Sequence, residues 1–306
     1  MSLLLFREIG ELFTIILLGI LLVKLKLLKA EDSRTLSVIV LYLVMPAVVI
    51  NAFQIEATPE IFHNLGLSLL AVVAVHILMF LLMVPCGRLL KLSAVEKALV
   101  LYPNCGNLTV PLVMAVLGPE WVVYTSVFSA VQQTLLWSHG RMLLSGKREF
   151  SLKAFFGNVN IIAIILGLAI FLLRVELPGF VTGVMSSLSQ IVGPMAMLTM
   201  GMLIGGKSLK QIAEYRRLWV PAVLRLVVFS LAAVCVLKYS GLAALTPQGE
   251  TVLLIAILGC TTPPAAAVTQ ISQVYGGDAE YASVVNVVTT MLCIITIPLM
   301  VAFYQM

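Results

Sequence analysis

Two short stretches of the sequence place helix-breaking residues and hydrogen-bonding side chains inside long hydrophobic runs. The first stretch contains Pro103, Asn104, Gly106, Asn107, Thr109 and Pro111, and the second contains Gly259, Thr261, Thr262, Pro263 and Pro264. A helix cannot pass such residues undisturbed, because proline lacks a backbone N–H and crowds the preceding turn. Free backbone groups at membrane depth persist only where protein or a water-filled cavity receives them. Each stretch therefore predicts a broken helix that lines a binding site.

The chemistry expected at these breaks is the binding of an anion. Threonine followed by proline is typical of a helix start, so a helix is expected to restart near Pro263, and another after Gly106 or Asn107. Each restart directs free N–H groups and the positive end of a helix dipole into the interior, where they attract a carboxylate. The candidate substrate-binding side chains are Asn104, Asn107, Thr109, Thr261, Thr262 and Gln270. Alternatively, these groups only satisfy the freed backbone of kinked helices.

Other polar residues in the hydrophobic runs have structural explanations. Gln132 and Gln133 could face a cavity, although bridging between helices is the commoner use of such residues. A lone His76 is more often part of hydrogen-bonded packing than of a proton relay. Arg225 lies deep in its run, where we expect it to snorkel or to have a structural partner, the alternative being an anionic substrate. No Asp or Glu lies at mid-membrane depth, but backbone carbonyls, Asn and Thr at the breaks could still hold sodium.

The elements that must position these residues are membrane-spanning helices. The 306 residues are 61% hydrophobic and 11% charged, with a mean hydropathy of +1.09, whereas soluble domains have roughly 25% charged residues. The fold class is therefore an all-α polytopic membrane protein. Ten apolar segments can be drawn, at roughly 6–25, 35–55, 62–87, 94–117, 120–144, 153–173, 178–205, 216–238, 250–274 and 280–303.

The basic residues indicate how the helices are oriented. Most of the 19 Lys and Arg residues lie in alternate short loops, and such loops are cytoplasmic in membrane proteins. Both termini are then extracytoplasmic, and the protein is expected in the inner or plasma membrane. Because the basic residues follow this pattern, the sequence pI near 9.0 does not indicate a nucleic-acid partner. The five cysteines have no metal-binding spacing, and neither a metal nor a cofactor is expected.

Residues 1–148 and 149–306 resemble each other in the order of their features. A proline lies in the second helix of each half, at Pro46 and Pro194, and Glu96 and Glu250 each open the helix that contains a break. Five helices per half is an odd number, so the second half must be inverted in the membrane. Inverted repeats with matched broken helices are typical of transporters. We therefore predict two inverted five-helix repeats in which helices 4 and 9 are broken and cross.

Small residues in the segment 178–205 predict a tight contact between helices. Gly201 and Gly205 are separated by three residues, a spacing that lets two helices approach closely in a membrane. Glycine is common in membrane helices, so this pattern does not identify the partner helix.

Several motifs together resemble the auxin efflux carrier family, within the bile acid/sodium symporter-like superfamily. The family includes the plant PIN auxin exporters and bacterial carriers of the malonate or malate type. The motifs are Pro103-Asn104 followed by Pro111, Thr262-Pro263-Pro264, Tyr275 to Ala279, Thr296 to Leu299, and Leu43 to Ala47. Taken in order, these motifs span nearly the whole chain, although each motif is short by itself.

The resemblance implies that the helices form two groups with different functions. Helices 1, 2, 6 and 7 would form a scaffold with a homodimer interface, and helices 3–5 and 8–10 a transport domain that moves like an elevator. In the family the asparagine of the fourth-helix motif contacts the substrate carboxylate, and Asn104 has that position here. The short segment Ser145–Lys153 replaces the long central loop of the plant exporters. The additional polarity of Gly106, Asn107 and Thr109 favours a smaller, more polar carboxylate than auxin.

The function predicted from the sequence is secondary transport of small organic anions, such as malonate, malate or auxin-like acids, by alternating access. One alternative is a passive anion channel or facilitator, although the polar residues gather at one level instead of forming a continuous lining. Another is a sodium-coupled organic-acid symporter. An intramembrane enzyme is not expected, because the chain lacks a nucleophile with a base, a zinc-binding helix motif and a pair of carboxylates at depth.

Overall fold

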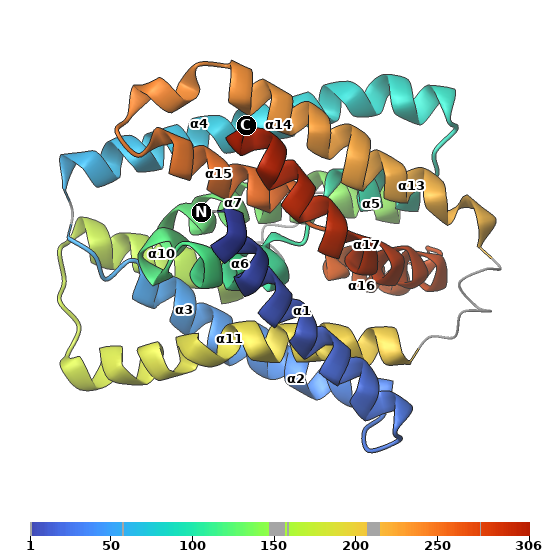
Figure 1. The fold of residues 1–306 in the computed structure, drawn as a ribbon, viewed down its shortest axis with the longest axis horizontal. Helices are drawn as coiled ribbons and strands as arrows, with labels where there is room; N and C mark the ends of the chain where they lie inside the picture. Colours follow the sequence, from blue (N-terminus) through green and yellow to red (C-terminus); the bar gives the residue numbers. More distant parts are fainter. Residues whose placement is uncertain (1, 57, 147–156, 158, 207–214, 276) are drawn as a thin grey trace. The chain divides into compact units, whose positions relative to one another are not determined.

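The computed structural model describes residues 2–56, 58–146, 157, 159–206, 215–275 and 277–306, and these form helices that follow the predicted apolar segments (Figure 1). Within the described residues, five helical stretches are long and apolar enough to span a membrane. They cover 30–52, 59–89, 179–205, 216–239 and 279–305. Shorter apolar helices lie at 14–24, 159–172 and 249–261. The all-helical class is confirmed for the described residues, and the arrangement as ten membrane spans in inverted repeats stays a prediction.

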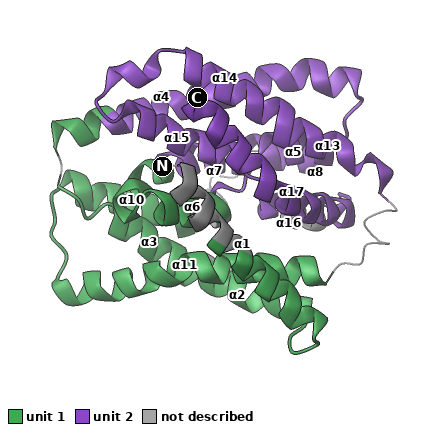
Figure 2. Cartoon of the chain, in the orientation of Figure 1, with its two compact units in different colours: residues 1–63, 106–126, 153–207 green, residues 64–105, 127–152, 208–306 purple. Residues whose placement is uncertain are grey.

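The chain divides into two compact units (Figure 2). Unit 1 comprises residues 1–63, 106–126 and 153–207, and unit 2 comprises residues 64–105, 127–152 and 208–306. Each unit draws on both halves of the sequence. Unit 1 contains the predicted helices 1, 2, 6 and 7 together with residues 106–126. One boundary between the units falls inside the first break, between Cys105 and Gly106.

Unit 1 is built around the contact between its first and last long helices. Its elements are α1 (Ser2–Lys24), η1 (Ala30–Asp32), α2 (Ser33–Ile39), η2 (Val40–Val44), α3 (Met45–Ala52), α6 (Val110–Val116), η4 (Pro119–Trp121), α10 (Val159–Leu172) and α11 (Gly179–Gly205). Figure 1 shows α1, in dark blue, crossing α11, in yellow. In addition, α3 packs against both α10 and α11.

Glycines allow α1 and α11 to touch backbone to backbone. A Cβ atom on Gly201 would collide with the carbonyl oxygen of Ile16, and one on Gly205 would lie 3.0 Å from the Cβ of Val23. On the facing helix, a Cβ on Gly19 would lie 2.9 Å from the Cα of Gly201. The tight contact predicted from Gly201 and Gly205 is therefore confirmed, and its partner is α1.

Unit 2 contains most of α4 (Pro59–Leu89), the helix that precedes the first break and both helices that flank the second. Its other elements are α5 (Ala94–Leu101), most of α7 (Val122–Leu135), η5 (Leu136–Gly140), α8 (Arg141–Ser145), η6 (Arg216–Leu218), α13 (Trp219–Val223), η7 (Leu224–Phe229), α14 (Ser230–Tyr239), η8 (Leu242–Leu245), α15 (Gly249–Thr261), α16 (Ala266–Val274) and α17 (Ala279–Gln305). The π-helical η3 (Cys105–Thr109) crosses the boundary between the units. Segment 147–156 in the predicted central loop lies outside the described residues.

Helix α15 forms the centre of unit 2. Every residue from Val252 to Leu258 is between 0 and 3% exposed. A helix that is apolar on all sides is stable only where it is surrounded, and α15 packs against α14 and α17. The burial explains why this stretch has no amphipathic pattern in the sequence.

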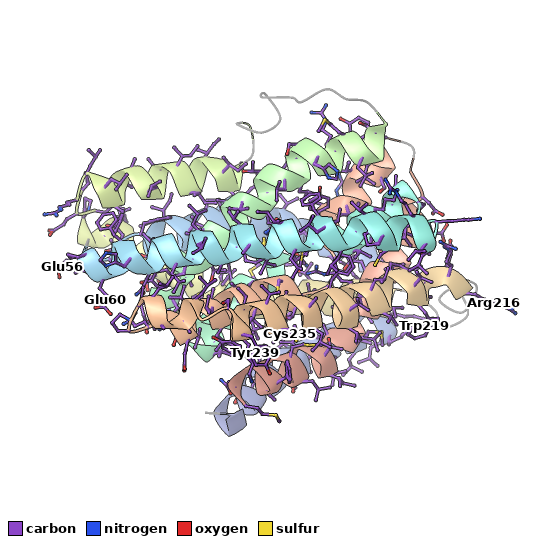
Figure 3. All side chains as sticks on the ribbon, turned by 90° about the horizontal axis from the view of Figure 1, so that it is seen from above. Glu56, Glu60, Arg216, Trp219, Cys235 and Tyr239 are labelled. Carbon is purple, nitrogen blue, oxygen red and sulfur yellow. The ribbon has the colours of Figure 1, made fainter. Side chains whose placement is uncertain are left out.

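The span 216–239 shows how a helix of unit 2 is matched to a bilayer. Trp219 and Tyr239 are exposed near its two ends, and Arg216 projects from the first of them (Figure 3). Aromatic residues prefer the two membrane–water interfaces, and basic residues prefer the cytoplasmic side. Exposed aromatic residues near both ends are consistent with a helix that spans a bilayer.

A polar cluster holds together the starts of three helices in unit 2. Ser93 and Glu96 cap α5 reciprocally, with the Ser93 N–H donating to Oε2 of Glu96 at 2.8 Å. Oε1 of Glu96 accepts from Nε of Arg217 at 2.7 Å and from the hydroxyl of Tyr281 at 3.1 Å. The buried carboxylate thus ties α5 to η6 and α17.

Candidate functional site

The two breaks lie against each other in unit 2 through their backbones. The N–H of Asn104 donates to the carbonyl of Pro263 at 2.8 Å, and the N–H of Ala265 donates to the carbonyl of Tyr102, also at 2.8 Å. Pro103 and Pro264 therefore face each other in an isolated antiparallel bridge. Proline fits these two positions, because the hydrogen bonds of such a bridge come from the flanking residues.

The second break differs from its predicted form in where the new helix begins. The expected start near Pro263, capped by threonine, is wrong: α16 begins at Ala266, and its N-cap residue is Ala265. Thr262 is instead the C-cap of α15, and its hydroxyl donates to the carbonyl of Gly259 at 2.9 Å. The Thr261 hydroxyl similarly donates to the carbonyl of Ile257 at 2.9 Å. Both hydroxyls bond to their own helix, a use for which threonine is suited.

The first break contains an asparagine whose side chain makes no hydrogen bond to the described residues. This residue, Asn104, is 5% exposed. An amide of this kind has N–H groups that can donate to a ligand, so it is a candidate for binding one. The Thr109 hydroxyl is also buried and has no partner among the described residues. The side chains of two other candidates, Asn107 and Gln270, and the surroundings of Gly106 lie outside the described part.

Gln132 on α7 bridges to the first break. Its Nε2 donates to the carbonyl of Pro103 at 3.0 Å, and its Oε1 accepts from Sγ of Cys105 at 3.2 Å. Gln132 is 2% exposed. The commoner use of a membrane glutamine, bridging between helices, is the one present here.

Arg225 reaches both breaks from η7. The expected role was snorkelling or a structural partner. The side chain is fully buried, so it does not snorkel, and the structural partner is the part of that expectation that is confirmed. Nε donates to the carbonyl of Thr262 at 2.9 Å, and Nη2 donates to that of Cys260 at 2.5 Å. Nη1 donates to the carbonyl of Val100 at 3.1 Å. These carbonyls are at the ends of α5 and α15, where a helix leaves its last carbonyls unpaired.

Aromatic and histidine side chains pack around the breaks. His76 bonds through Nδ1 to the carbonyl of Val72 at 2.8 Å, and its ring lies 5.4 Å from that of Phe128. The same Phe128 ring lies against Gly259, where an added Cβ would approach it to 2.8 Å. His76 therefore takes part in hydrogen-bonded packing, as expected.

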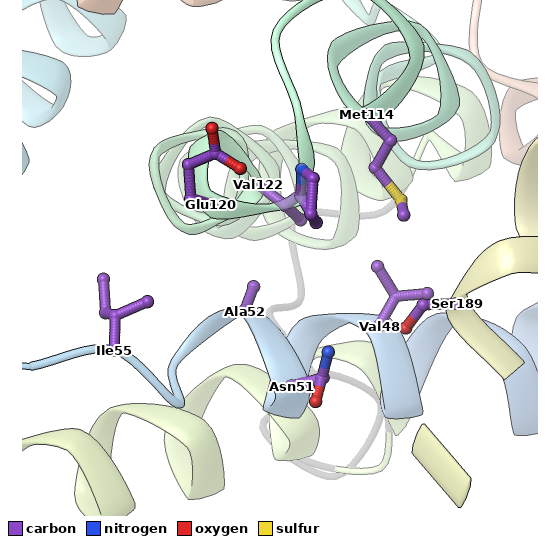
Figure 4. A pocket seen from close by; sticks show the side chains of 9 residues that line it. Val48, Asn51, Ala52, Ile55, Met114, Glu120, Val122 and Ser189 are labelled. Atoms are coloured by element: carbon purple, nitrogen blue, oxygen red, sulfur yellow. The ribbon is translucent and has the colours of Figure 1, made fainter. Parts of the chain in front are cut away.

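A separate cavity of ≈ 200 Å³ lies within unit 1 (Figure 4). It is lined by Val48, Asn51, Ala52, Ile55, Met114, Pro119, Glu120, Val122 and Ser189. The wall is mainly apolar, and its charged member is the exposed Glu120. An acidic group at the rim makes this cavity a poor site for an anion. The sequence contained no motif for it, because its lining comes from three separate segments.

The described residues contain no cluster of His, Cys, Asp or Glu that could hold a metal ion. The breaks bring together backbone groups, an amide, threonine hydroxyls, cysteine thiols and one guanidinium. Backbone N–H groups and amides can bind and orient an anion.

Comparison with protein families gives two matches to a single family, described as membrane transport protein, at residues 4–154 and 149–301. A search of the curated proteins gives no significant match. The two family matches together cover nearly the entire chain, with its apolar helices and paired breaks. The chain therefore belongs to the membrane transport protein family.

Proposed function

We propose that this protein is a secondary carrier that moves small organic anions, carboxylates of the malonate or malate type or auxin-like acids, by alternating access. The observation that supports this most is Asn104, a residue 5% exposed whose amide makes no hydrogen bond to the described residues where the two breaks meet. A carboxylate would accept a hydrogen bond from this amide, and a hydrogen bond to a charged group is worth about 1.5–3 kcal/mol. Thr109, Asn107, Thr261, Thr262 and Gln270 are proposed as further contacts, of which the threonines of the second break contribute least, because their hydroxyl protons are already donated.

The movement proposed is of the elevator type, between the scaffold and transport domains defined above. The scaffold also forms a homodimer, and both termini are on the extracytoplasmic side of the inner or plasma membrane. Support comes from the family and from the basic loops. A fixed site at a pair of discontinuous helices is how many secondary transporters bind their substrates.

Transport by purified protein in liposomes tests the proposal. Uptake of labelled malonate, malate and indole-acetate should saturate, and unlabelled substrate inside the vesicles should stimulate it by counterflow. Replacing Asn104 with Ala should lower uptake roughly 10–100-fold, because a hydrogen bond to a charged group is worth about 1.5–3 kcal/mol.

The matched control is Asn64→Ala. Asn64 is a fully buried asparagine of the same unit, and its amide donates to Gln248 at 3.0 Å. This variant should lose stability and retain substrate affinity. Unchanged transport by Asn104→Ala would exclude the proposed contact, and flux that does not saturate, with single-channel currents, would favour a channel instead.

A further inference from the structure

The guanidinium of Arg225 is a buried positive charge without a buried negative partner. No carboxylate forms an ion pair with it among the described residues, and the acceptors of its nitrogens are three backbone carbonyls and the sulfur of Met79 at 3.9 Å. Removing a charge from water is costly unless other groups stabilise it. The stabilising groups here are the carbonyl ends of two helices, which carry the negative pole of the helix dipole.

The backbone carbonyls that accept hydrogen bonds from Arg225 are groups that could also coordinate a metal cation. In transporters with discontinuous helices, unwound carbonyls and the C-terminal ends of half-helices coordinate sodium. Here the carbonyls of Val100, Cys260 and Thr262, from both broken helices, converge on one guanidinium. Its planar fork of donors can bond to several oxygens at once, as a coordinated ion does.

The local backbone fixes Arg225 in this position. It lies in the π-helical turn η7 (Leu224–Phe229), and the hydroxyl of Ser230 donates to its carbonyl at 2.8 Å. Such wide turns within helices often occur at functional sites. The hydroxyl satisfies a carbonyl that the wide turn leaves less well bonded, and Arg225 cannot withdraw to the surface without disrupting the span.

We propose that the guanidinium of Arg225 is a fixed cation between the two breaks. It binds the backbone carbonyls of both breaks at the place where a coupling ion would otherwise bind. Sodium then has no site at the breaks, and the carrier works without it. The claim that Arg225 replaces a coupling ion rests on the proposed transport function. The hydrogen bonds from Arg225 to the carbonyls do not depend on that function. Arg225 is a positioning residue, because it acts through the backbone of the two breaks.

Thermal unfolding of the purified protein in detergent, without substrate, tests this proposal. Unfolding temperatures are compared in sodium chloride and in choline chloride at equal concentration. The wild-type protein should unfold at the same temperature in both salts. Arg225→Met should unfold at a lower temperature and gain a saturable stabilisation by sodium, roughly 2–4 °C at a concentration about tenfold above its dissociation constant.

Two further variants separate a cation site from a general effect. Arg225→Lys keeps a charge with three donors and should remain insensitive to sodium. Arg216→Met removes an exposed arginine from the start of the same span and should also remain insensitive. Should Arg225→Met fail to fold, the wild-type protein and Arg225→Lys still provide the comparison.

Saturable stabilisation of the wild-type protein by sodium would overturn the proposal, and so would a folded Arg225→Met that gains no response to sodium. Asn104→Ala should respond to salt as the wild-type protein does. If the protein does not transport carboxylates but shows these salt responses, the cation role of Arg225 stands and the transport proposal fails. The two proposals can therefore fail separately.

Discussion

The two breaks have similar backbones and different side-chain chemistry. They pair through reciprocal hydrogen bonds on either side of Pro103 and Pro264. In the first break, the Asn104 side chain makes no hydrogen bond to the described residues, and the Thr109 hydroxyl is buried without a partner among them. In the second, the hydroxyls of Thr261 and Thr262 donate to carbonyls of their own helix.

On the proposed function, the breaks have different tasks. The first would supply the side chains that receive the substrate, of which the buried Thr109 hydroxyl is unsatisfied when the site is empty. The second supplies the backbone against which the first is held, through the carbonyl of Pro263 and the N–H of Ala265. Two breaks can therefore share a backbone geometry and differ in the side chains that they leave free to bind.

The largest effect is expected from Asn104→Asp. This change keeps the size of the side chain, removes its two N–H donors and adds a negative charge beside the proposed carboxylate. Carboxylate uptake should fall about 100-fold or more, on the order of 3 kcal/mol. The rate of uptake into liposomes measures it, and uptake close to that of wild type would show that the first break does not receive the anion.

An intermediate effect, on stability, is expected from Gly259→Ala in the second break. An added Cβ would lie 2.8 Å from the Phe128 ring, and overpacking of a core costs typically 1–3 kcal/mol. The temperature of unfolding should fall, while the substrate affinity of the folded protein changes little. Gly66→Ala is the control, because nothing lies within 4 Å of a Cβ at Gly66. If both variants unfold like the wild-type protein, the second break is not held by packing.

The smallest effects are expected from removing one hydroxyl in each break. Thr109→Val deletes an unpaired hydroxyl, and should lower substrate affinity about threefold without loss of stability. Thr262→Val deletes a paired hydroxyl, and should lower stability by about 1 kcal/mol with little change in affinity. Substrate titration and thermal unfolding of both variants provide the comparison. If both substitutions change substrate affinity and stability to the same extent, the two hydroxyls do not have the different roles expected of them.

The positions of the breaks could be predicted because proline restricts the backbone wherever it occurs. The role of Thr262 was mistaken because a threonine before proline suits the end of one helix as well as the start of the next. The structure resolves this ambiguity in favour of α15, since the Thr262 hydroxyl reaches Gly259 one turn earlier.

The partners of Arg225 could not be predicted from the sequence. Its acceptors are backbone carbonyls 35, 37 and 125 residues away, and every residue type has a carbonyl. Only the fold determines which of them face a guanidinium. The cavity in unit 1 was missed for a related reason, since apolar residues from separate segments leave no pattern in the order of the chain.

The long-range hydrogen bond of Arg225 has a consequence for biosynthesis. The carbonyl of Val100 is synthesised 125 residues before Arg225, which donates a hydrogen bond to it. Chains fold progressively as they are synthesised, and an unsatisfied backbone group in a bilayer costs several kcal/mol. The Val100 carbonyl at the first break therefore lacks this hydrogen bond until the second half of the chain has been synthesised. A nascent chain stalled before Arg225 would be a natural target for membrane chaperones and quality-control proteases.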